Sequence, residues 1–287
     1  MTIQMKGMIF AAGLGTRLKP FTLTAPKALV PLNGVPMLER VIRSMAPAGI
    51  RDIVVNVHHF APKIVEFLRR NDNFGLNIAV SDESDLLLDT GGGLLKARPL
   101  LDDGSGEPIL LHNADIFTDL PLGAMIEAHE TSGADVTLLC AHRDSSRTLY
   151  FRDNHLCGWQ NLKTGELKPA GFRPDETADS SPFGGVHIVS PKIFPLLEKF
   201  NERLKNEGLK DEVLKNEGMK NKGLNNDGLK EVPETEAFGI VPFSIVPFYL
   251  AEIEQLDIQR FLLPDDARWF DVGSSEKLAA AEATFRR

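Results

Sequence analysis

The sequence predicts an α/β fold: a doubly wound, mostly parallel sheet of the Rossmann-like type with a smaller mixed lobe. Three observations predict it. Short apolar runs alternate with amphipathic stretches as far as residue 141. The runs at 52–57 and 108–112 are apolar almost throughout, which is typical of parallel strands covered on both faces. After residue 145 the alternation stops and hairpin-like segments begin. This pattern indicates a βαβ sheet with an appended part.

The first half supplies the parallel strands and the helices that connect them. Pro36 opens the first helix, whose apolar residues recur at helical spacing, and Gly49 ends it. Because each helix lies between two apolar runs, the strands are expected to be parallel. We expect strands at 7–11, 52–57, 77–80, 108–112 and 134–141, with further helices at 61–70, after the glycines at 91–93, and at 121–130.

The second half is more mixed. Residues 148–160 predict a hairpin that turns at Asp153-Asn154. The remaining expected elements are a strand at 183–189, helices at 191–200 and 243–254, a strand at 258–263 and a terminal helix after Gly273. We interpret this half as a second binding lobe.

Residues 201–230 consist of six related pentads, among them NEGLK and NDGLK. An apolar residue at every fifth position fits neither the helical nor the strand period, and four pentads carry a glycine at their third position. We interpret the segment as a low-complexity surface insertion that extends the preceding helix and then frays.

Composition and charge limit the class of protein. The 287 residues are 43% hydrophobic and 25% charged, an ordinary globular balance, and the net charge of −8 argues against nucleic acid as a partner. No apolar run is long enough to span a bilayer, so we expect no membrane partner. The N-terminal residues lack the apolar segment of a signal peptide, and Cys140 and Cys157 fit buried thiols. We therefore expect a cytoplasmic protein.

The loop after the first strand is the strongest candidate for a binding site. It carries Gly13, Gly15 and Arg17, and Lys27 follows. Small residues let backbone N–H groups approach an anion, and the two cations would neutralise it, so the loop suits a polyphosphate. Leu18 stands where a dinucleotide-binding fingerprint needs its third glycine, and the Gly-Lys-Ser/Thr of a P-loop is missing. On spacing alone, a glycine turn with solvated cations is an equal alternative.

Two aspartates are candidate metal ligands. Asp115 follows an apolar strand, so it lies at the carboxyl end of the sheet, where open α/β sheets bind ligands. Asp271 also follows an apolar pair. Two carboxylates with phosphate oxygens suit Mg²⁺, whereas a capping or turn role is the alternative for Asp115. The glycines of Thr90–Gly93 suit close approach to a base or ribose, or else a bare helix N-terminus.

Together these residues resemble the signature of sugar-1-phosphate nucleotidyltransferases. Thr90–Gly93, Asn113–Asp115 and Trp269–Gly273 follow in the family's order, so the resemblance covers the chain apart from the pentads. Within the family, the chain looks most like N-acetylmuramate-1-phosphate uridylyltransferases, with mannose-1-phosphate guanylyltransferases next. The signature positions agree in type and spacing: Gly13, Leu14, Gly15, Thr16, Arg17, Leu18, Pro20, Thr22, Pro26, Lys27 and Pro31.

The resemblance implies a role for each motif residue. Arg17 would hold the outer phosphates, which leave as pyrophosphate, and Lys27 would neutralise the α-phosphate. Asp115 and Asp271 would hold Mg²⁺. The acceptor motif Glu-Lys-Pro appears as Leu167-Lys168-Pro169. The sugar phosphate would contact Lys168 and the backbone at Gly185. The nucleotide would be bordered by Ala11, Ala12, Gly13, Gly15, Thr16, Thr90, Gly91, Gly92 and Asn113.

The implied domain is single, 1–287, with a nucleotide-binding half at 7–145 and an acceptor-binding half at 146–287. The implied reaction converts an NTP and a sugar 1-phosphate into an NDP-sugar and pyrophosphate. UTP is favoured and GTP is next, as in the synthesis of UDP-N-acetylmuramate or a related NDP-sugar for the cell envelope. The alternatives are a mannose- or heptose-1-phosphate guanylyltransferase, a catalytically silent nucleotide-sugar sensor, and an enzyme with another acceptor such as phosphocholine. The oligomeric state stays open.

Overall fold

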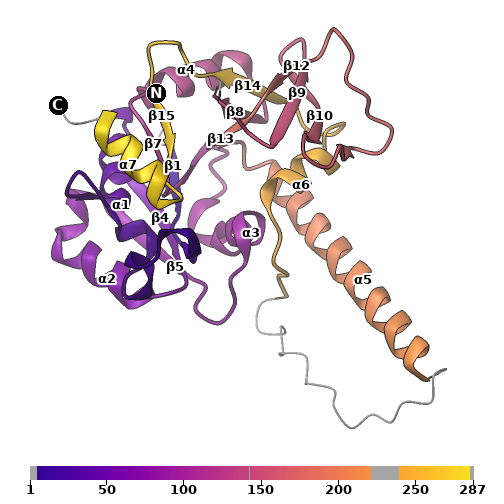
Figure 1. Cartoon of the computed structure of the whole chain (residues 1–287), viewed down its shortest axis with the longest axis horizontal. Helices are drawn as coiled ribbons and strands as arrows, with labels where there is room; N and C mark the ends of the chain where they lie inside the picture. The colour runs from indigo at the N-terminus through magenta and orange to yellow at the C-terminus, as the bar shows by residue number, and fades with distance from the viewer. Residues whose placement is uncertain (1–4, 142, 221–238, 285–287) are drawn as a thin grey trace.

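One mixed eleven-stranded sheet forms the centre of the molecule (Figure 1). The computed structural model describes residues 5–141, 143–220 and 239–284. The strand order is β12-β9-β10-β14-β8-β13-β6-β1-β4-β5, with β11 paired to β10. Two short two-stranded sheets, β15-β7 and β2-β3, lie beside it. The expected second lobe thus continues the main sheet, through antiparallel pairs and through the parallel pair of β14 with β8.

The parallel part of the sheet comes from the first half, as predicted. β5, β4, β1 and β6 are parallel neighbours in that order. Their connecting helices begin and end close to the expected residues. The strands are β1 (Lys6–Phe10), β4 (Asp52–Val57), β5 (Asn77–Asp82) and β6 (Ile109–Asn113), and the helices are α1 (Met37–Met45), α2 (Ala61–Arg70) and α3 (Asp89–Leu101). Five 3-10 turns lie between them: η1 (Thr16–Leu18), η2 (Phe21–Leu23), η3 (Lys27–Leu29), η4 (Ala46–Ala48) and η5 (Asp72–Gly75).

Both faces of the parallel strands are buried. Met8 and Val54 belong to one apolar cluster and Ile9 and Val55 to another, because successive side chains of a strand point to opposite faces. The near-continuous apolar runs in the sequence reflect this double covering. Asn56 is a polar residue in such a run and is also buried.

The second half adds strands that pair mostly antiparallel, although β14 is parallel to its neighbour β8. β13 (Phe183–Val189) lies between β6 and β8 (Val136–Cys140) and is antiparallel to both. The predicted hairpin is present, and Asp153 and Asn154 at its turn have φ values of 48° and 71°. Its strands are β9 (Arg147–Arg152) and β10 (His155–Asn161); β11 (Leu167–Lys168), β12 (Asp179–Ser181) and β14 (Ile258–Leu262) complete this side, and α4 (Leu122–Ser132) precedes β8.

Helix α5 (Ile193–Lys220) projects away from the sheet (Figure 1). It extends the expected helix at 191–200 well into the pentads, as the sequence predicts; residues 221–230 of the pentads lie outside the described residues. Cys140 is a buried free thiol and Cys157 is half-buried. No helix among the described residues has the length and apolar character needed to cross a membrane.

The last elements return to the first half of the chain. β15 (Trp269–Asp271) pairs with β7 (Ile116–Thr118), and α7 (Ser275–Thr284) packs near the hairpin β2 (Pro31–Leu32) and β3 (Val35–Pro36). α6 (Ile245–Ala251) precedes them. A small apolar cluster joins these parts: Leu18, Val30, Leu32, Met37, Val272, Leu278 and Ala281.

Candidate active site

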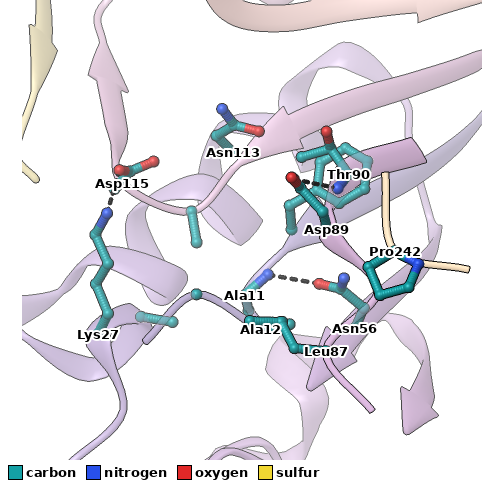
Figure 2. A pocket seen from close by; sticks show the side chains of 14 residues that line it. Ala11, Ala12, Lys27, Asn56, Leu87, Asp89, Thr90, Asn113, Asp115 and Pro242 are labelled. Carbon is teal, nitrogen blue, oxygen red and sulfur yellow. Dashed lines mark hydrogen bonds and ion pairs between the residues drawn. The ribbon is translucent and has the colours of Figure 1, made fainter. Parts of the chain in front are cut away.

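A first pocket of about 440 Å³ lies at the carboxyl ends of β1, β4 and β6 (Figure 2). This is where open α/β sheets bind ligands. The pocket is mostly apolar, with Lys27 and Asp115 at one end, as Figure 2 shows. Its walls are Phe10, Ala11, Ala12, Gly13, Lys27, Ala28, Asn56, Leu87, Asp89, Thr90, Asn113, Ala114, Asp115 and Pro242.

A second pocket of about 640 Å³ is lined mainly by the second half of the chain. It shares no lining residue with the first pocket, but it contains Arg17 from the glycine loop and Asp271. Lys168, expected at the acceptor, also lines it, whereas Gly185 does not. The molecule therefore has two neighbouring pockets, each lined by one of the two predicted aspartates.

Residues from the linings of the two pockets converge at Gly273, which itself lines neither. A Cβ at this glycine would lie 2.7 Å from Asp271 Oδ1, 3.0 Å from Arg17 Nη2 and 3.4 Å from Asp115 Oδ2. Asp271 is opposite Ile116 in the β15–β7 pair, and the Val272 N–H donates to the Asp115 carbonyl at 2.9 Å. The pairing of β15 with β7 thus brings two aspartates far apart in the sequence to one point.

The glycine loop is shaped to fit Lys27. Gly15 has a φ of +62°, a conformation that favours glycine, and its carbonyl accepts hydrogen bonds from Leu18 N–H and the Thr22 hydroxyl, both at 2.9 Å. A Cβ at Gly15 would lie 2.8 Å from Lys27 Cβ. The glycine therefore lets the loop and the Lys27 segment pack closely. Leu18, next to Arg17, is fully buried, which anchors the loop.

Each aspartate is paired with a lysine. Lys27 Nζ forms an ion pair with Asp115 (Figure 2), and Lys277 Nζ donates to Asp271 at 2.5 Å. Burial would raise the pKa of Asp271, but hydrogen bonds from Lys277 and from the Gly273 N–H outweigh it, and the pKa lies below its ordinary value. Asp271 is thus held as a carboxylate at neutral pH.

Asn56 and Glu83 support the floor of the first pocket. The Ala11 N–H donates to Asn56 Oδ1 at 2.7 Å, and the Asn56 amide donates to Glu83 Oε1 at 2.7 Å. The second oxygen of Glu83 accepts the Leu88 N–H at 3.0 Å. Burial raises the pKa of Glu83, although these hydrogen bonds act against it. The chain of bonds fixes the backbone at Ala11 relative to the segment that carries Leu88.

The two aspartates fit a divalent metal of the magnesium type. Their oxygens converge at Gly273, and hard carboxylate oxygens are what Mg²⁺ takes, usually one or two from the protein. Among the described residues there is no group of three or more His, Cys, Asp or Glu side chains that could hold an ion. Substrate oxygens and water would therefore have to complete the ligand set.

Most of the predicted nucleotide-binding residues line the first pocket, but Gly91 and Gly92 do not. They are buried in the first turn of α3 and donate to the Phe243 carbonyl at 2.8 and 3.2 Å. A Cβ at Gly91 would lie 2.3 Å from the Phe243 ring. These glycines serve helix packing, while Asp89 and Thr90 beside them face the pocket. Gly15 and Thr16 lie in the loop next to it, outside its lining.

Sequence reasoning missed several site residues. Asn56 is one of them, although a polar residue within an apolar strand is itself a signal of a buried hydrogen-bond role. Glu83 and Lys277 carry no such signal, because their partners lie far away in sequence or across a turn. Gly185, expected at the sugar phosphate, packs closely against the Asn113 side chain. A Cβ added at Gly185 would lie 2.9 Å from Asn113 Nδ2.

Known proteins share this architecture. A crystal structure of a putative glucose-1-phosphate thymidylyltransferase from Bacillus anthracis, in complex with sucrose, superposes with a TM-score of 0.69 at 16% identity, covering 98% of this chain and 95% of that one. HddC from Yersinia pseudotuberculosis, complexed with GMP-PN, superposes with a TM-score of 0.63 at 18% identity, covering 99% and 100%. At such identities, these structures show the fold.

Sequence relatives are closer. A mannose-1-phosphate guanyltransferase of Yarrowia lipolytica is 32% identical over 197 residues, which is 68% of this chain and 52% of the relative. A probable mannose-1-phosphate guanylyltransferase 3 of Oryza sativa subsp. japonica is 34% identical over 195 residues, with the same shares. The aligned part thus spans about half the length of these curated relatives. The sequence profile of the nucleotidyl transferase family matches residues 6–151, which contain the glycine loop, Lys27 and Asp115, and the chain belongs to this family.

Proposed function

We propose that the protein transfers a nucleoside monophosphate from an NTP to a sugar 1-phosphate, giving an NDP-sugar and pyrophosphate. The observation that carries the proposal is the meeting of two pockets at one charged cluster. Lys27 and Asp115 line the first pocket, Arg17 and Asp271 line the second, and Gly273 lies where they converge. An enzyme that joins two anions needs two binding sites with cations between them.

The chemistry requires no general base, because the sugar phosphate is already an anionic nucleophile. One of its oxygens attacks the α-phosphorus. The new P–O bond forms as the bond to the oxygen bridging the α- and β-phosphates breaks, and the electron pair leaves with pyrophosphate. Positioning and charge neutralisation supply the rate.

The proposed residue roles combine what the family resemblance implies with the positions of the residues around Gly273. Arg17 would hold the outer phosphates, and Lys27 would leave Asp115 to neutralise the α-phosphate. Asp115 and Asp271 would hold Mg²⁺, which when bound offsets phosphate charge. Ala11, Ala12 and Thr90 would border the nucleoside, since they line the first pocket. Its volume of about 440 Å³ is in the range of small-molecule sites.

GTP is the nucleotide that we propose first, and mannose 1-phosphate the acceptor. The relatives in Yarrowia lipolytica and rice are named for mannose-1-phosphate guanylyl transfer, and the HddC structure contains GMP-PN. These relatives give no support to the preference for UTP, and they favour the guanylyl alternative over the N-acetylmuramate reading.

A pyrophosphate-release screen tests the function. Each of the four common NTPs is combined with the 1-phosphates of mannose, heptose, glucose and N-acetylmuramate, and with phosphocholine. We expect release with GTP and mannose 1-phosphate. Binding of NTP without release for any acceptor would instead identify a nucleotide-sugar sensor.

Two variants test the residues. We expect Lys27→Ala and Asp271→Asn each to lower turnover by about 10²–10³-fold, because one charge at the transition state is removed. Circular dichroism and the thermal midpoint should show a folded protein. Lys192→Ala is the control, since Lys192 pairs with Asp135 at 3.0 Å and lines neither pocket. Near-normal release from either site variant would refute the assignment.

A further inference from the structure

Arg143 is a half-buried cation of the second pocket that the signature motifs do not contain. Its guanidinium carbon lies 4.7 Å from the centre of the Trp269 ring, and Nη2 donates to the Phe183 carbonyl at 3.1 Å. Its Nε–H is buried and has no hydrogen-bond partner among the described residues. The side chain is therefore held in place by a ring and a carbonyl, with donor capacity to spare.

The surroundings of the Arg143 guanidinium favour the binding of an anion. Burial lowers the pKa of Arg143, and Asp271 is the nearby carboxylate whose charge acts against that. Asp271 is already hydrogen-bonded to Lys277 at 2.5 Å. A cation taken partly out of water without a matched partner is costly, and a bound anion would offset that cost.

The rest of the second pocket points the same way. Four cations line it, Arg17, Arg143, Arg147 and Lys168, against two carboxylates, Glu166 and Asp271. Lys168 pairs with Glu166 at 3.1 Å, and its ammonium lies 5.4 Å from the Trp159 ring. The pocket is thus an electropositive site in a chain of net charge −8.

We propose that Arg143 binds the phosphate of the acceptor sugar 1-phosphate, at the end of the second pocket that contains Arg17 and Asp271. The inference rests on the proposed function and assigns to Arg143 the contact that the family resemblance gives to Lys168. A planar guanidinium offers two parallel donors to a phosphate, and the indole of Trp269 fixes its plane. Lys168, tied to Glu166 and Trp159, would border the sugar.

Steady-state kinetics with each substrate varied in turn test this contact. For Arg143→Met, we expect the KM for mannose 1-phosphate to rise about tenfold or more, while the KM for GTP stays within about twofold. Arg143→Lys keeps the charge without the planar fork, so its acceptor KM should fall between those of the wild type and Arg143→Met. Calorimetric titration with mannose 1-phosphate alone should show the same order of affinities.

Arg98→Met is the matched control. Arg98 also lies over an aromatic ring, with its guanidinium carbon 5.3 Å from the centre of Phe194, but it pairs with Asp102 and Glu198 and lines neither pocket. The KM values of Arg98→Met for mannose 1-phosphate and for GTP should be unchanged.

The outcomes separate the two proposals. An unchanged acceptor KM in Arg143→Met, with active wild type, would overturn the role of Arg143 and leave the proposed function standing. A wild-type protein that releases no pyrophosphate with any combination would overturn both. Should Arg143→Met fail to fold, Arg143→Lys decides: a raised acceptor KM supports the role, and an unchanged one overturns it.

Discussion

Among single residues, Gly273 is the one on which the geometry of the charged cluster most depends. We predict that Gly273→Ala lowers turnover by about tenfold or more, because a Cβ 2.7 Å from Asp271 Oδ1 and 3.0 Å from Arg17 Nη2 must displace both groups. These atoms are the ends of flexible side chains, so the fold should accommodate the methyl group. Pyrophosphate release and the thermal midpoint measure the two effects separately.

The control for this variant is Gly123→Ala. Gly123 lies in α4, and a Cβ there meets nothing within 4 Å. In a helix, alanine stabilises by about 0.5–1 kcal/mol relative to glycine, so this variant should be active and slightly more stable. Equal activity of Gly273→Ala and wild type would show that the cluster is not as closely packed as described.

The buried His187 should make the free energy of unfolding depend on pH in the acid range. Burial, with a smaller contribution from His112, lowers the pKa of His187 to about 3, and both of its ring nitrogens lack hydrogen-bond partners among the described residues. The folded state keeps this imidazole neutral, whereas the unfolded chain binds a proton below about pH 6.5. The neutral His187 therefore costs the folded state no stability above about pH 6.5. Below that pH the free energy of unfolding falls progressively until about pH 3.

The variant His187→Phe should remove this pH dependence. A phenyl ring keeps the stacking on Phe183, whose ring centre is 5.2 Å away. Between pH 7 and pH 5, we expect the variant to lose about 2 kcal/mol less unfolding free energy than the wild type, at about 1.4 kcal/mol per pH unit below 6.5. Urea unfolding at the two pH values measures it, with exposed His59→Ala as control. An identical loss in variant and wild type would contradict the argument.

At the scale of elements, the packing of α3 explains its glycines. Gly91 lets the helix approach Phe243, whose ring carbon Cε2 would lie 2.3 Å from an added Cβ. We predict that Gly91→Ala destabilises the protein by about 1–3 kcal/mol through overpacking, despite the higher helix propensity of alanine. Chemical denaturation measures the change against Gly123→Ala, which should shift stability the other way. A stabilised Gly91→Ala would show that Phe243 moves freely.

Some elements of the fold were predictable from local sequence patterns, and others depend on distant residues. The parallel strands and their helices were predictable because double burial leaves a local signature of apolar runs. The purpose of Gly91 and Gly92 was not, because it depends on Phe243, about 150 residues later in the chain. The antiparallel insertion of β13 between β6 and β8 is likewise a long-range pairing that no local period encodes.

For the whole molecule, the sequence predicts which residues belong to the candidate site, but it does not predict how they are arranged in space. Asp115 and Asp271 could be singled out by their position after apolar segments, and the structure brings both to Gly273 through the β15–β7 pair. Arg143 could not be singled out, because its significance depends on Trp269 and on a buried Nε–H that has no hydrogen-bond partner in the described part of the chain. Local sequence patterns indicate candidate residues, whereas the second pocket forms only when Arg17 of the first half meets residues of the second half.

The pentad segment gives the last prediction at this scale, because the chain leaves the body and returns to it at one place. Asn201 on α5 donates to the Gly239 carbonyl at 2.9 Å and accepts the Val241 N–H at 3.0 Å. These bonds fix both ends of the intervening segment. We predict that replacing residues 209–236 with an eight-residue Gly/Ser linker leaves the fold and the activity intact.

The reach of the linker is sufficient. Eight extended residues span about 26 Å, whereas the helix from Asn201 to residue 208 is only about 10 Å long. The bonds of Asn201 at both ends of the replaced segment are kept, so the thermal midpoint should stay the same. Asn201→Ala in the shortened chain is the counterpart, since it removes both bonds and should lower the midpoint. Loss of pyrophosphate release from the shortened, folded chain would instead assign the pentads a part in catalysis.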